Sequence, residues 1–387
     1  QRELDRQVEL QRARLEARRQ AQKARRLRRV ALALGMLLVI PVLAATVSLQ
    51  QRRSSWQRLE SFPRDAAPAL AATWATDPGQ PGQMLICAGT SNVGIGCTQE
   101  GRTWNIFQQD LPTGKPASSN NSDFSGAVRG VQTLSIDGEN LSRIVAFLWD
   151  GNAYLSDDGG VRWRLASAGL PSNPGHISAA ALHGQLALAV IDSALYASRD
   201  GGEHWAPVGN NSQPYWGQVH DMLIDTRSAT AYAATDNGVY AAVSQQPWRW
   251  QRVINLPHVY HVAQRWQEGD DLLVVAQGFN GQSILYRWTP GQAPRSLASF
   301  AADVQALAAD PTPGSGVAAY LLLDNGEVVA VGETGGRRSL GRRPDWPWEQ
   351  SFDLLAAPSP SGDGSLLLLG HTSGLLRFLG PGTFTAR

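Results

Sequence analysis

Six apolar stretches of the sequence carry a polar residue at their second position, and these residues are the first candidates for a binding site. The stretches begin at residues 131, 177, 219, 260, 304 and 352. Their second residues are Gln132, Ser178, His220, His261, Gln305 and Asp353. Amide, hydroxyl, imidazole and carboxylate groups can hold a small polar ligand through hydrogen bonds, or ordered water in its place. Imidazole and carboxylate are also ligands of zinc. The six residues form one aligned polar column, and the elements that carry them decide whether the column binds a ligand, water or a metal.

A second candidate lies in GGRRSLGRRPDWPW, residues 335 to 348. Its basic and aromatic residues are Arg337, Arg338, Arg342, Arg343, Trp346 and Trp348. Arginine and tryptophan are enriched at binding hot spots, which makes the segment a candidate contact surface for an acidic or membrane-embedded partner. The alternative is a solvated loop whose tryptophans pack between structural units.

The elements that must position these candidates are repeated along the chain. SDDGGVRW at 156–163 recurs as SRDGGEHW at 198–205, and more weakly as CTQEGRTW at 97–104. The aspartates can accept hydrogen bonds from N–H groups of their own turn, the glycines permit positive φ, and the tryptophans can pack between neighbouring sheets. We therefore expect a structural role for Gly101, Thr103, Trp104, Ser156, Asp158, Gly160, Trp163, Ser198, Asp200, Gly202 and Trp205.

A short apolar strand repeats at a similar interval. Its aligned residues Ala153, Leu195, Val239, Leu285, Val328 and Leu375 are 42, 44, 46, 43 and 47 residues apart. A further copy near Val93 precedes a polar insert over 113–127. Seven units of four short strands predict an all-β, seven-bladed propeller. The spacing in SWQRLESFP predicts that residues 55–60 supply the outer strand of the last blade.

The octapeptides resemble the Asp-box of the bacterial neuraminidase repeat (BNR) family, in which the box forms the turn between the last two strands of a propeller blade. The family includes sialidases. It also includes a non-catalytic seven-bladed branch, the photosystem II stability and assembly factor type, which binds membrane subunits through an arginine-rich patch. The present sequence is similar to that branch in blade number and in the weakness of its boxes.

The sialidase reaction needs three arginines to bind a carboxylate, a Tyr/Glu nucleophile pair and an aspartic acid. The family places an (F/Y)-R-I-P motif near the start of the propeller, whereas the corresponding stretch here, residues 68–78, contains no arginine. We therefore expect that the chain has no sialidase activity, is not an enzyme and binds no cofactor. Seven-fold geometry would also spread His220, His261 and Asp353 apart, so we expect no metal. A hydrated ring and a small-ligand site remain as alternatives for the polar column.

The N-terminal region predicts a membrane anchor. Residues 1–29 contain eleven Arg and Lys against four Asp and Glu, which predicts a solvated basic helix touching anionic headgroups rather than a partner site. Residues 30–49 carry no charge, and twenty helical residues span about 30 Å of hydrocarbon. The positive-inside rule places the N-terminus in the cytoplasm and residues 50–387 on the extracytoplasmic side. A cleaved signal peptide is the alternative, although both segments are long for one.

Cys87 and Cys97 are the only cysteines. A hairpin centred on residue 92 would set them opposite one another, which predicts a cross-strand disulfide and suits an oxidising compartment.

Together these features predict a bacterial single-pass membrane protein with an extracytoplasmic, non-catalytic propeller. Its predicted work is protein–protein interaction, as an accessory subunit or assembly factor of a larger integral-membrane complex, with the bilayer contacted through residues 30–49. The alternative is a propeller that binds or processes carbohydrate at its polar channel mouth. Nucleic acid is not an expected partner, because the only strongly basic segment faces the cytoplasmic side of the membrane.

Overall fold

The computed structural model describes the second of the two compact units into which the chain divides, Gln1–Ser54 and Ser55–Arg387. The described residues are 56–59, 61–62, 69–76, 83–101, 103–107, 109–112, 130–172, 175–208, 217–225, 227–243, 249–265, 271–278, 280–342, 351–359, 364–371 and 374–378. The predicted helices over 1–29 and 30–49 lie outside these residues, so the structure does not support the transmembrane helix. Within the described stretches, no helix has the length and hydropathy needed to cross a bilayer.

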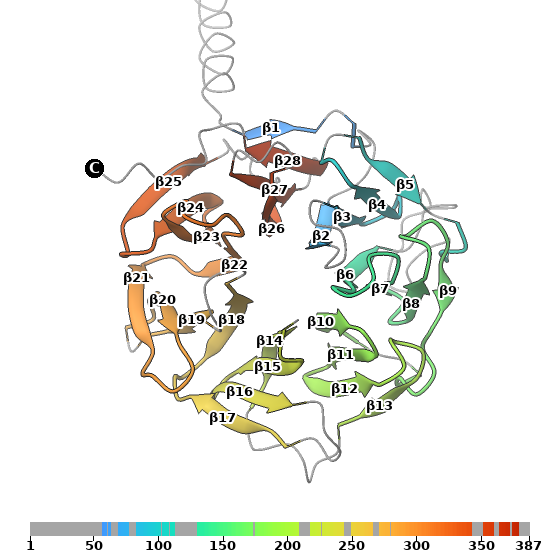
Figure 1. The fold of residues 1–387 in the computed structure, drawn as a ribbon, viewed down its shortest axis with the longest axis horizontal. Helices are drawn as coiled ribbons and strands as arrows, with labels where there is room; N and C mark the ends of the chain where they lie inside the picture. The colour runs from blue at the N-terminus through green and yellow to red at the C-terminus, as the bar shows by residue number, and fades with distance from the viewer. Residues whose placement is uncertain are drawn as a thin grey trace, which may run out of the picture. The chain divides into compact units, whose positions relative to one another are not determined.

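Seven four-stranded antiparallel sheets form a ring, which confirms the predicted seven-bladed propeller (Figure 1). Blade 1 consists of β2 (Ala69–Thr76), β3 (Met84–Thr90), β4 (Ile95–Thr98) and β5 (Asn105–Phe107), and blade 2 of β6 (Val131–Ile136), β7 (Ile144–Leu148), β8 (Ala153–Ser156) and β9 (Arg164–Leu165). Blade 3 consists of β10 (Ile177–His183), β11 (Leu186–Ile191), β12 (Ala194–Ser198) and β13 (Trp205–Pro207). Blade 4 consists of β14 (Val219–Ile224), β15 (Thr230–Thr235), β16 (Gly238–Val243) and β17 (Gln251–Ile254). Blades 5 to 7 are β18 (Val259–Gln264), β19 (Leu272–Gln277), β20 (Ser283–Trp288) and β21 (Arg295–Phe300); β22 (Val304–Ala309), β23 (Val317–Leu323), β24 (Glu327–Gly332) and β25 (Arg337–Arg342); and β26 (Ser351–Pro358), β27 (Ser365–His371) and β28 (Gly374–Phe378) with β1 (Trp56–Arg58).

The second strand of most blades is apolar on both faces because each sheet is covered by a neighbouring sheet on either side. β11 (LALAVI) and β23 (VAAYLLL) are buried at every position. The core accordingly lies between blades, as where Leu188 and Val190 of blade 3 pack with Met222 and Ile224 of blade 4. Continuous apolar runs are typical of strands buried on both faces.

The ring closes through a strand from the N-terminal side of the propeller. β1 pairs antiparallel with β28, with Trp56 opposite Phe378 and Arg58 opposite Leu376. The Trp56 and Phe378 rings lie 5.2 Å apart. Blade 7 therefore contains strands from both ends of the propeller, and the first blade begins at β2.

The two strong octapeptide repeats form the turns from β8 to β9 and from β12 to β13. The Ser198 hydroxyl accepts the Gly202 N–H at 2.8 Å and donates to Asp200 Oδ1 at 2.7 Å. Asp200 Oδ1 also accepts the His204 N–H at 3.0 Å. Ser156, Asp158 and Gly160 repeat this arrangement. These turns are thus held by their own side chains.

The weak third repeat keeps the turn by a different route. Its cysteine and glutamine stand where the other copies have serine and aspartate, and the Thr98 hydroxyl accepts the Gly101 N–H at 3.1 Å instead. Cys87 and Cys97 face each other in register across β3 and β4, and their sulfur atoms are joined in a disulfide.

Substitution Ser198→Ala is expected to lower the free energy of unfolding by about 1–2 kcal/mol, because the buried Gly202 N–H loses its acceptor. Urea unfolding of the purified chain would measure the change. Ser296→Ala, at an exposed position of β21, is the control and should change stability by less than about 0.5 kcal/mol. An equal loss in both variants would show that the Ser198 hydroxyl does not stabilise the turn.

Candidate functional site

Every inner strand bends at the same place, close to its first residue. The register shifts by one residue between Val131 and Thr133 in β6, and at the corresponding place in β2, β10, β14, β18, β22 and β26. A bulge of this kind leaves one residue unpaired and redirects its side chain. The bulged residues are Leu70, Gln132, Ser178, His220, Tyr260, Gln305 and Phe352.

The single polar column predicted from the sequence is therefore wrong in two blades. His261 and Asp353 lie one position beyond the bulge, level with Asp221, because Tyr260 and Phe352 occupy the bulged positions of their strands. All six predicted residues nevertheless line the central channel. They form two successive levels rather than one ring.

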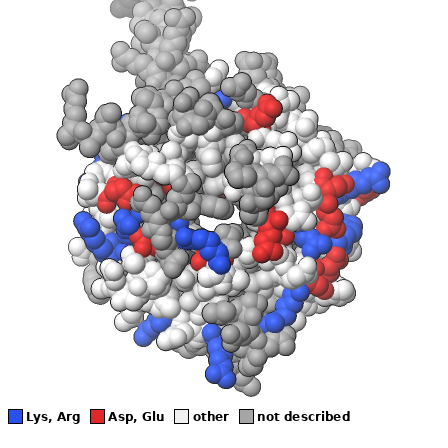
Figure 2. Space-filling model, viewed as in Figure 1, with Lys and Arg blue, Asp and Glu red and all other residues white. Residues whose placement is uncertain are grey.

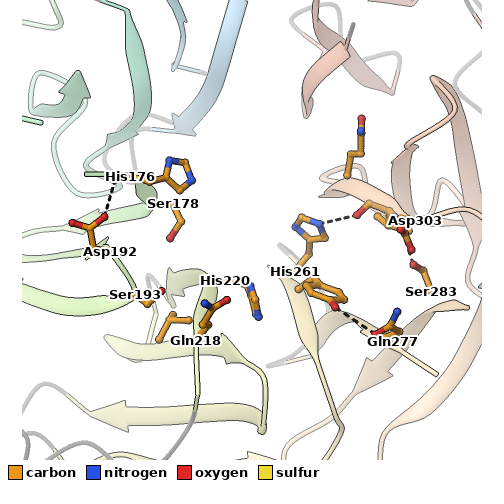
Figure 3. A pocket seen from close by; sticks show the side chains of 14 residues that line it. His176, Ser178, Asp192, Ser193, Gln218, His220, His261, Gln277, Ser283 and Asp303 are labelled. Atoms are coloured by element: carbon orange, nitrogen blue, oxygen red, sulfur yellow. Dashed lines mark hydrogen bonds between the residues drawn. The ribbon is translucent and has the colours of Figure 1, made fainter. Parts of the chain in front are cut away.

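A cavity of about 850 Å³ opens at one mouth of the channel, on blades 3 to 6. Its lining combines bulged residues with turn residues, as Figure 3 shows. His176, Asp192 and Ser193 lie on one side, Ser283 and Asp303 lie on the other, and His220 and His261 lie between them. The volume is within the usual range for ligand sites, about 300–1,000 Å³.

His220 is held at this mouth by a carboxylate and an aromatic ring. Its Nε2 lies 2.8 Å from Asp236 Oδ1, and its ring meets the Tyr260 ring edge-on at a centroid distance of 5.0 Å. Asp236 Oδ2 also accepts the Gln218 N–H at 2.9 Å. Burial opposes ionisation of Asp236, but these hydrogen bonds hold the pKa of its carboxyl below the usual value. The imidazole is thus fixed in direction beside an ionised group.

Asp192 plays a similar part in blade 3. Its two carboxylate oxygens accept the N–H groups of Gly175 and His176, both at 2.9 Å. Asp192 and Ser193 have φ values of 49° and 65°, a conformation that suits a tight turn. The turn between β11 and β12 is thereby tied to the chain that leads into β10, which fixes the edge of the cavity.

Deeper in the channel, Asp221 and His261 face one another. His261 Nε2 donates to the carbonyl oxygen of Val304 at 3.1 Å, and its Nδ1 lies 3.9 Å from Asp221 Oδ2. Burial lowers the pKa of His261 and raises the pKa of Asp221. Both shifts favour the uncharged forms of the pair.

Asp353 lies at the same level on blade 7. Burial, and then the charge of Asp221, raise the pKa of Asp353 to about 6, against the N–H groups of Ala72 and Leu354 that favour its ionised form. The Asp353 carboxyl is therefore expected to take up a proton under mildly acidic conditions.

Several of these polar side chains also join neighbouring blades. Gln132 Oε1 accepts the Ile177 N–H at 2.9 Å, and Asp221 Oδ2 accepts the Val262 N–H at 3.1 Å. Asp353 Oδ2 accepts the Ala72 N–H at 2.8 Å. Each bond runs from one inner strand to the inner strand of the following blade. These groups support the ring, whereas the exposed side chains at the mouth remain open to a ligand.

The described residues contain no group of three or more His, Cys, Asp or Glu side chains placed to hold a metal ion. The arrangement suits recognition by hydrogen bonds and charge: Ser178, Gln218 and Gln305 are exposed at the mouth beside the fixed imidazole of His220.

The arginine-rich candidate is only partly described. Arg337 and Arg338 lie on β25, the outer strand of blade 6, which ends at Arg342. Arg337 donates to the carbonyl oxygen of Ser299 in blade 5 at 2.5 Å, and its guanidinium lies 5.5 Å from the centroid of the Phe300 ring. Arg337 therefore ties two blades together. Arg343, Trp346 and Trp348 lie outside the described residues.

The mouth residues that the sequence did not single out come mostly from turns. Asp192 and Asp236 follow the second strands of blades 3 and 4, and Asp303 precedes β22. The sequence signal that could have identified Asp192 and Asp236 is an aspartate directly after an apolar strand, at the turn to the next strand. Tyr260 was missed because the bulge displaces the alignment by one residue.

No family model and no curated protein matches the sequence. Among solved structures, YCF48 from Cyanidioschyzon merolae has a TM-score of 0.54 and 14% identity, over 84% of this chain and 98% of that chain. A structure of YCF48 bound to D1 peptide has a TM-score of 0.53 and 16% identity, over 84% and 97% of the two chains. The extracellular domain of BT4673 from B. thetaiotaomicron, described as a hybrid two-component system, has a TM-score of 0.54 and 13% identity, over 84% of this chain and 39% of that one. At these identities the likeness shows a shared propeller fold.

Proposed function

We propose that this chain is a non-catalytic interaction propeller that receives a segment of a partner protein at the mouth formed by blades 3 to 6. The observation that carries the proposal is the cavity itself. Its exposed lining residues, among them Ser178, Gln218 and Gln305, offer both hydrogen-bond donors and acceptors. An extended peptide presents the complementary N–H and C=O groups along its whole length. The YCF48 structure with a bound D1 peptide is a precedent for a propeller of this fold binding a protein segment.

The finer part of the proposal concerns the setting. The uncharged run over residues 30–49, after the basic stretch, supports a single-pass anchor in the cell membrane with the propeller on the extracytoplasmic side. A propeller anchored there would meet integral-membrane proteins. We therefore propose an accessory subunit or assembly factor of a membrane complex as its role.

The test is recovery of partners from the native membranes. The tagged full-length chain is extracted in mild detergent, and the proteins that stay bound are identified and quantified by mass spectrometry. We expect an integral-membrane protein in near-stoichiometric amount. Recovery of the chain alone would rule out a stable subunit role.

A pair of variants tests the face that is used. Gln305→Trp places a large side chain in the mouth and is expected to reduce recovery of the partner at least about tenfold, because the indole occupies the space of the segment. Gln185→Trp is the matched control, since Gln185 is exposed in the turn between β10 and β11, and it should leave recovery unchanged. Full recovery with Gln305→Trp would contradict the mouth as the interface, and Arg338 on β25 would be the next residue to test.

The second candidate function is carbohydrate binding at the same mouth. It is favoured by the combination of His, Gln, Ser and Asp side chains with the Tyr260 ring, since a sugar offers many hydroxyl groups and an apolar C–H face to an aromatic ring. A glycan array probed with the full-length chain distinguishes the two functions. A glycan bound by the wild type and lost in His220→Gln, without a protein partner in the membrane extract, would favour this second function.

A further inference from the structure

Aspartate side chains line both the cavity at the mouth and the channel behind it. Asp192 and Asp303 line the mouth, and Asp221 and Asp353 line the channel. Neither lining contains a lysine or an arginine among the described residues. The mouth therefore offers the carboxylates of Asp192 and Asp303, and its basic side chains are histidines rather than lysine or arginine.

The described arginine ion pairs lie elsewhere, toward the opposite ends of the inner strands. Arg164 on β9 pairs with Asp157 and with Glu203 of the next blade. Arg265 and Arg287 of blade 5 both pair with Glu333 of blade 6, at distances of 2.5 and 3.0 Å. Figure 2 shows acidic and basic side chains next to one another over these blades. Charges are therefore balanced there by neighbours within the chain.

At the mouth, the carboxylates have other partners. Asp192 is bound by two backbone N–H groups, and Asp236 by a backbone N–H and His220. Asp303 is exposed, and the described residues provide it with no ion-pair partner. Backbone N–H groups orient a carboxylate without cancelling its charge.

The walls of the cavity suit a cation that also carries an apolar stem. The Tyr260 ring stands edge-on against His220, and its hydroxyl donates to Gln277 Oε1 at 3.4 Å. An aromatic wall attracts ammonium and guanidinium groups and also packs against the methylene groups that carry them. The cavity, its aromatic wall and its unbalanced charge thus all favour the same chemical class of occupant.

We infer that the partner segment inserts a lysine or arginine side chain into this mouth, with Asp303 at the rim as the carboxylate that meets its charge. This inference rests on the proposed function and specifies the chemistry of the partner.

Labelled pentapeptides test it directly. Fluorescein-labelled Gly-Gly-Lys-Gly-Gly, and the same peptide with Arg, Gln or Glu at the centre, are titrated with the purified full-length chain at low ionic strength. We expect the Lys and Arg peptides to bind about tenfold more tightly than the Gln peptide, equivalent to about 1.4 kcal/mol. The preference should weaken in 0.5 M salt, where the Debye length falls below about 5 Å.

Two charge-matched variants locate the effect. Asp303→Asn should reduce the preference for Lys over Gln to about twofold or less. Glu100→Gln removes an exposed carboxylate from the turn between β4 and β5, which lies outside the lining of this cavity, and should leave the preference intact. Equal affinity for the Lys and Gln peptides, or an equal loss in both variants, would overturn the inference.

The outcome is separable from that of the proposed function. A partner recovered from membranes together with no Lys preference would overturn only the cationic side chain. A Lys preference that depends on Asp303, without any recovered partner, would support the cation site and contradict the protein-binding role.

Discussion

Replacing Trp205 by alanine is expected to lower the free energy of unfolding of the propeller by about 3–5 kcal/mol, the largest loss among the substitutions considered. Trp205 is only 4% exposed, and its ring meets the Phe147 ring of blade 2 at 5.4 Å. Its indole N–H donates to the carbonyl oxygens of Ala166 and Gly202 at 2.9 and 3.1 Å. The substitution therefore leaves a cavity between two blades and two carbonyl groups without this donor.

Urea unfolding followed by circular dichroism measures the effect. Trp149→Ala is the matched control, because Trp149 is 60% exposed and its loss should change stability by less than about 0.5 kcal/mol. If both variants unfolded at the same urea concentration as the wild type, the tryptophan of the octapeptide repeat would not be the contact that holds blades 2 and 3 together.

The second large effect concerns pH. A carboxyl group whose pKa is higher in the folded chain than in the unfolded chain binds its proton more tightly when folded. Its contribution to stability is therefore greatest in acid and falls as pH rises. For Asp353, the folded value of about 6 exceeds the ordinary value of 3.8. Stability should fall by at most about 3 kcal/mol between pH 4 and pH 7 through this group.

Asp353→Asn removes the ionisation while keeping an oxygen that can accept the Ala72 N–H. We expect the variant to lose stability relative to the wild type at pH 4 and to regain most of the difference by pH 7. Urea unfolding at half-unit pH intervals measures the two curves. Asp324→Asn, a substitution of an exposed carboxylate, should run parallel to the wild type across the whole range. A constant difference between Asp353→Asn and the wild type at every pH would show that Asp353 titrates normally in the folded chain.

The fold could be predicted because the propeller repeats one local pattern. Ala153, Leu195 and Val239 recur in the third strand of successive blades, and each is almost fully buried between neighbouring sheets. Burial of this kind constrains residue type strongly, so the repeat persists in blades 4 to 7, which have no octapeptide. Both the period and the number of blades can be read from the sequence.

The site was predictable only in part, because function at the mouth depends on single-residue shifts. The inner-strand bulge places Tyr260 where the sequence alignment placed His261. Nothing in the period-two pattern of a strand signals a bulge, since an unpaired residue can be polar or apolar. Asp192 and Asp236 acquire their roles from the return of the chain at a turn, which brings together residues 16 to 18 positions apart.

The mixed blade 7 has a consequence for the order in which the molecule can form. Its outermost strand, β1, is among the first parts of the propeller to be synthesised, whereas its partner β28 is the last strand. Blades 1 to 6 each close on a contiguous stretch of chain and can form as they emerge. The free edge of β28 stays unpaired until Trp56–Arg58 reaches it, and an unpaired edge is a site for wrong pairing with other chains. The β1–β28 pairing is thus of very long range in sequence, and we expect it to form late, with misassembly concentrated before the two ends meet.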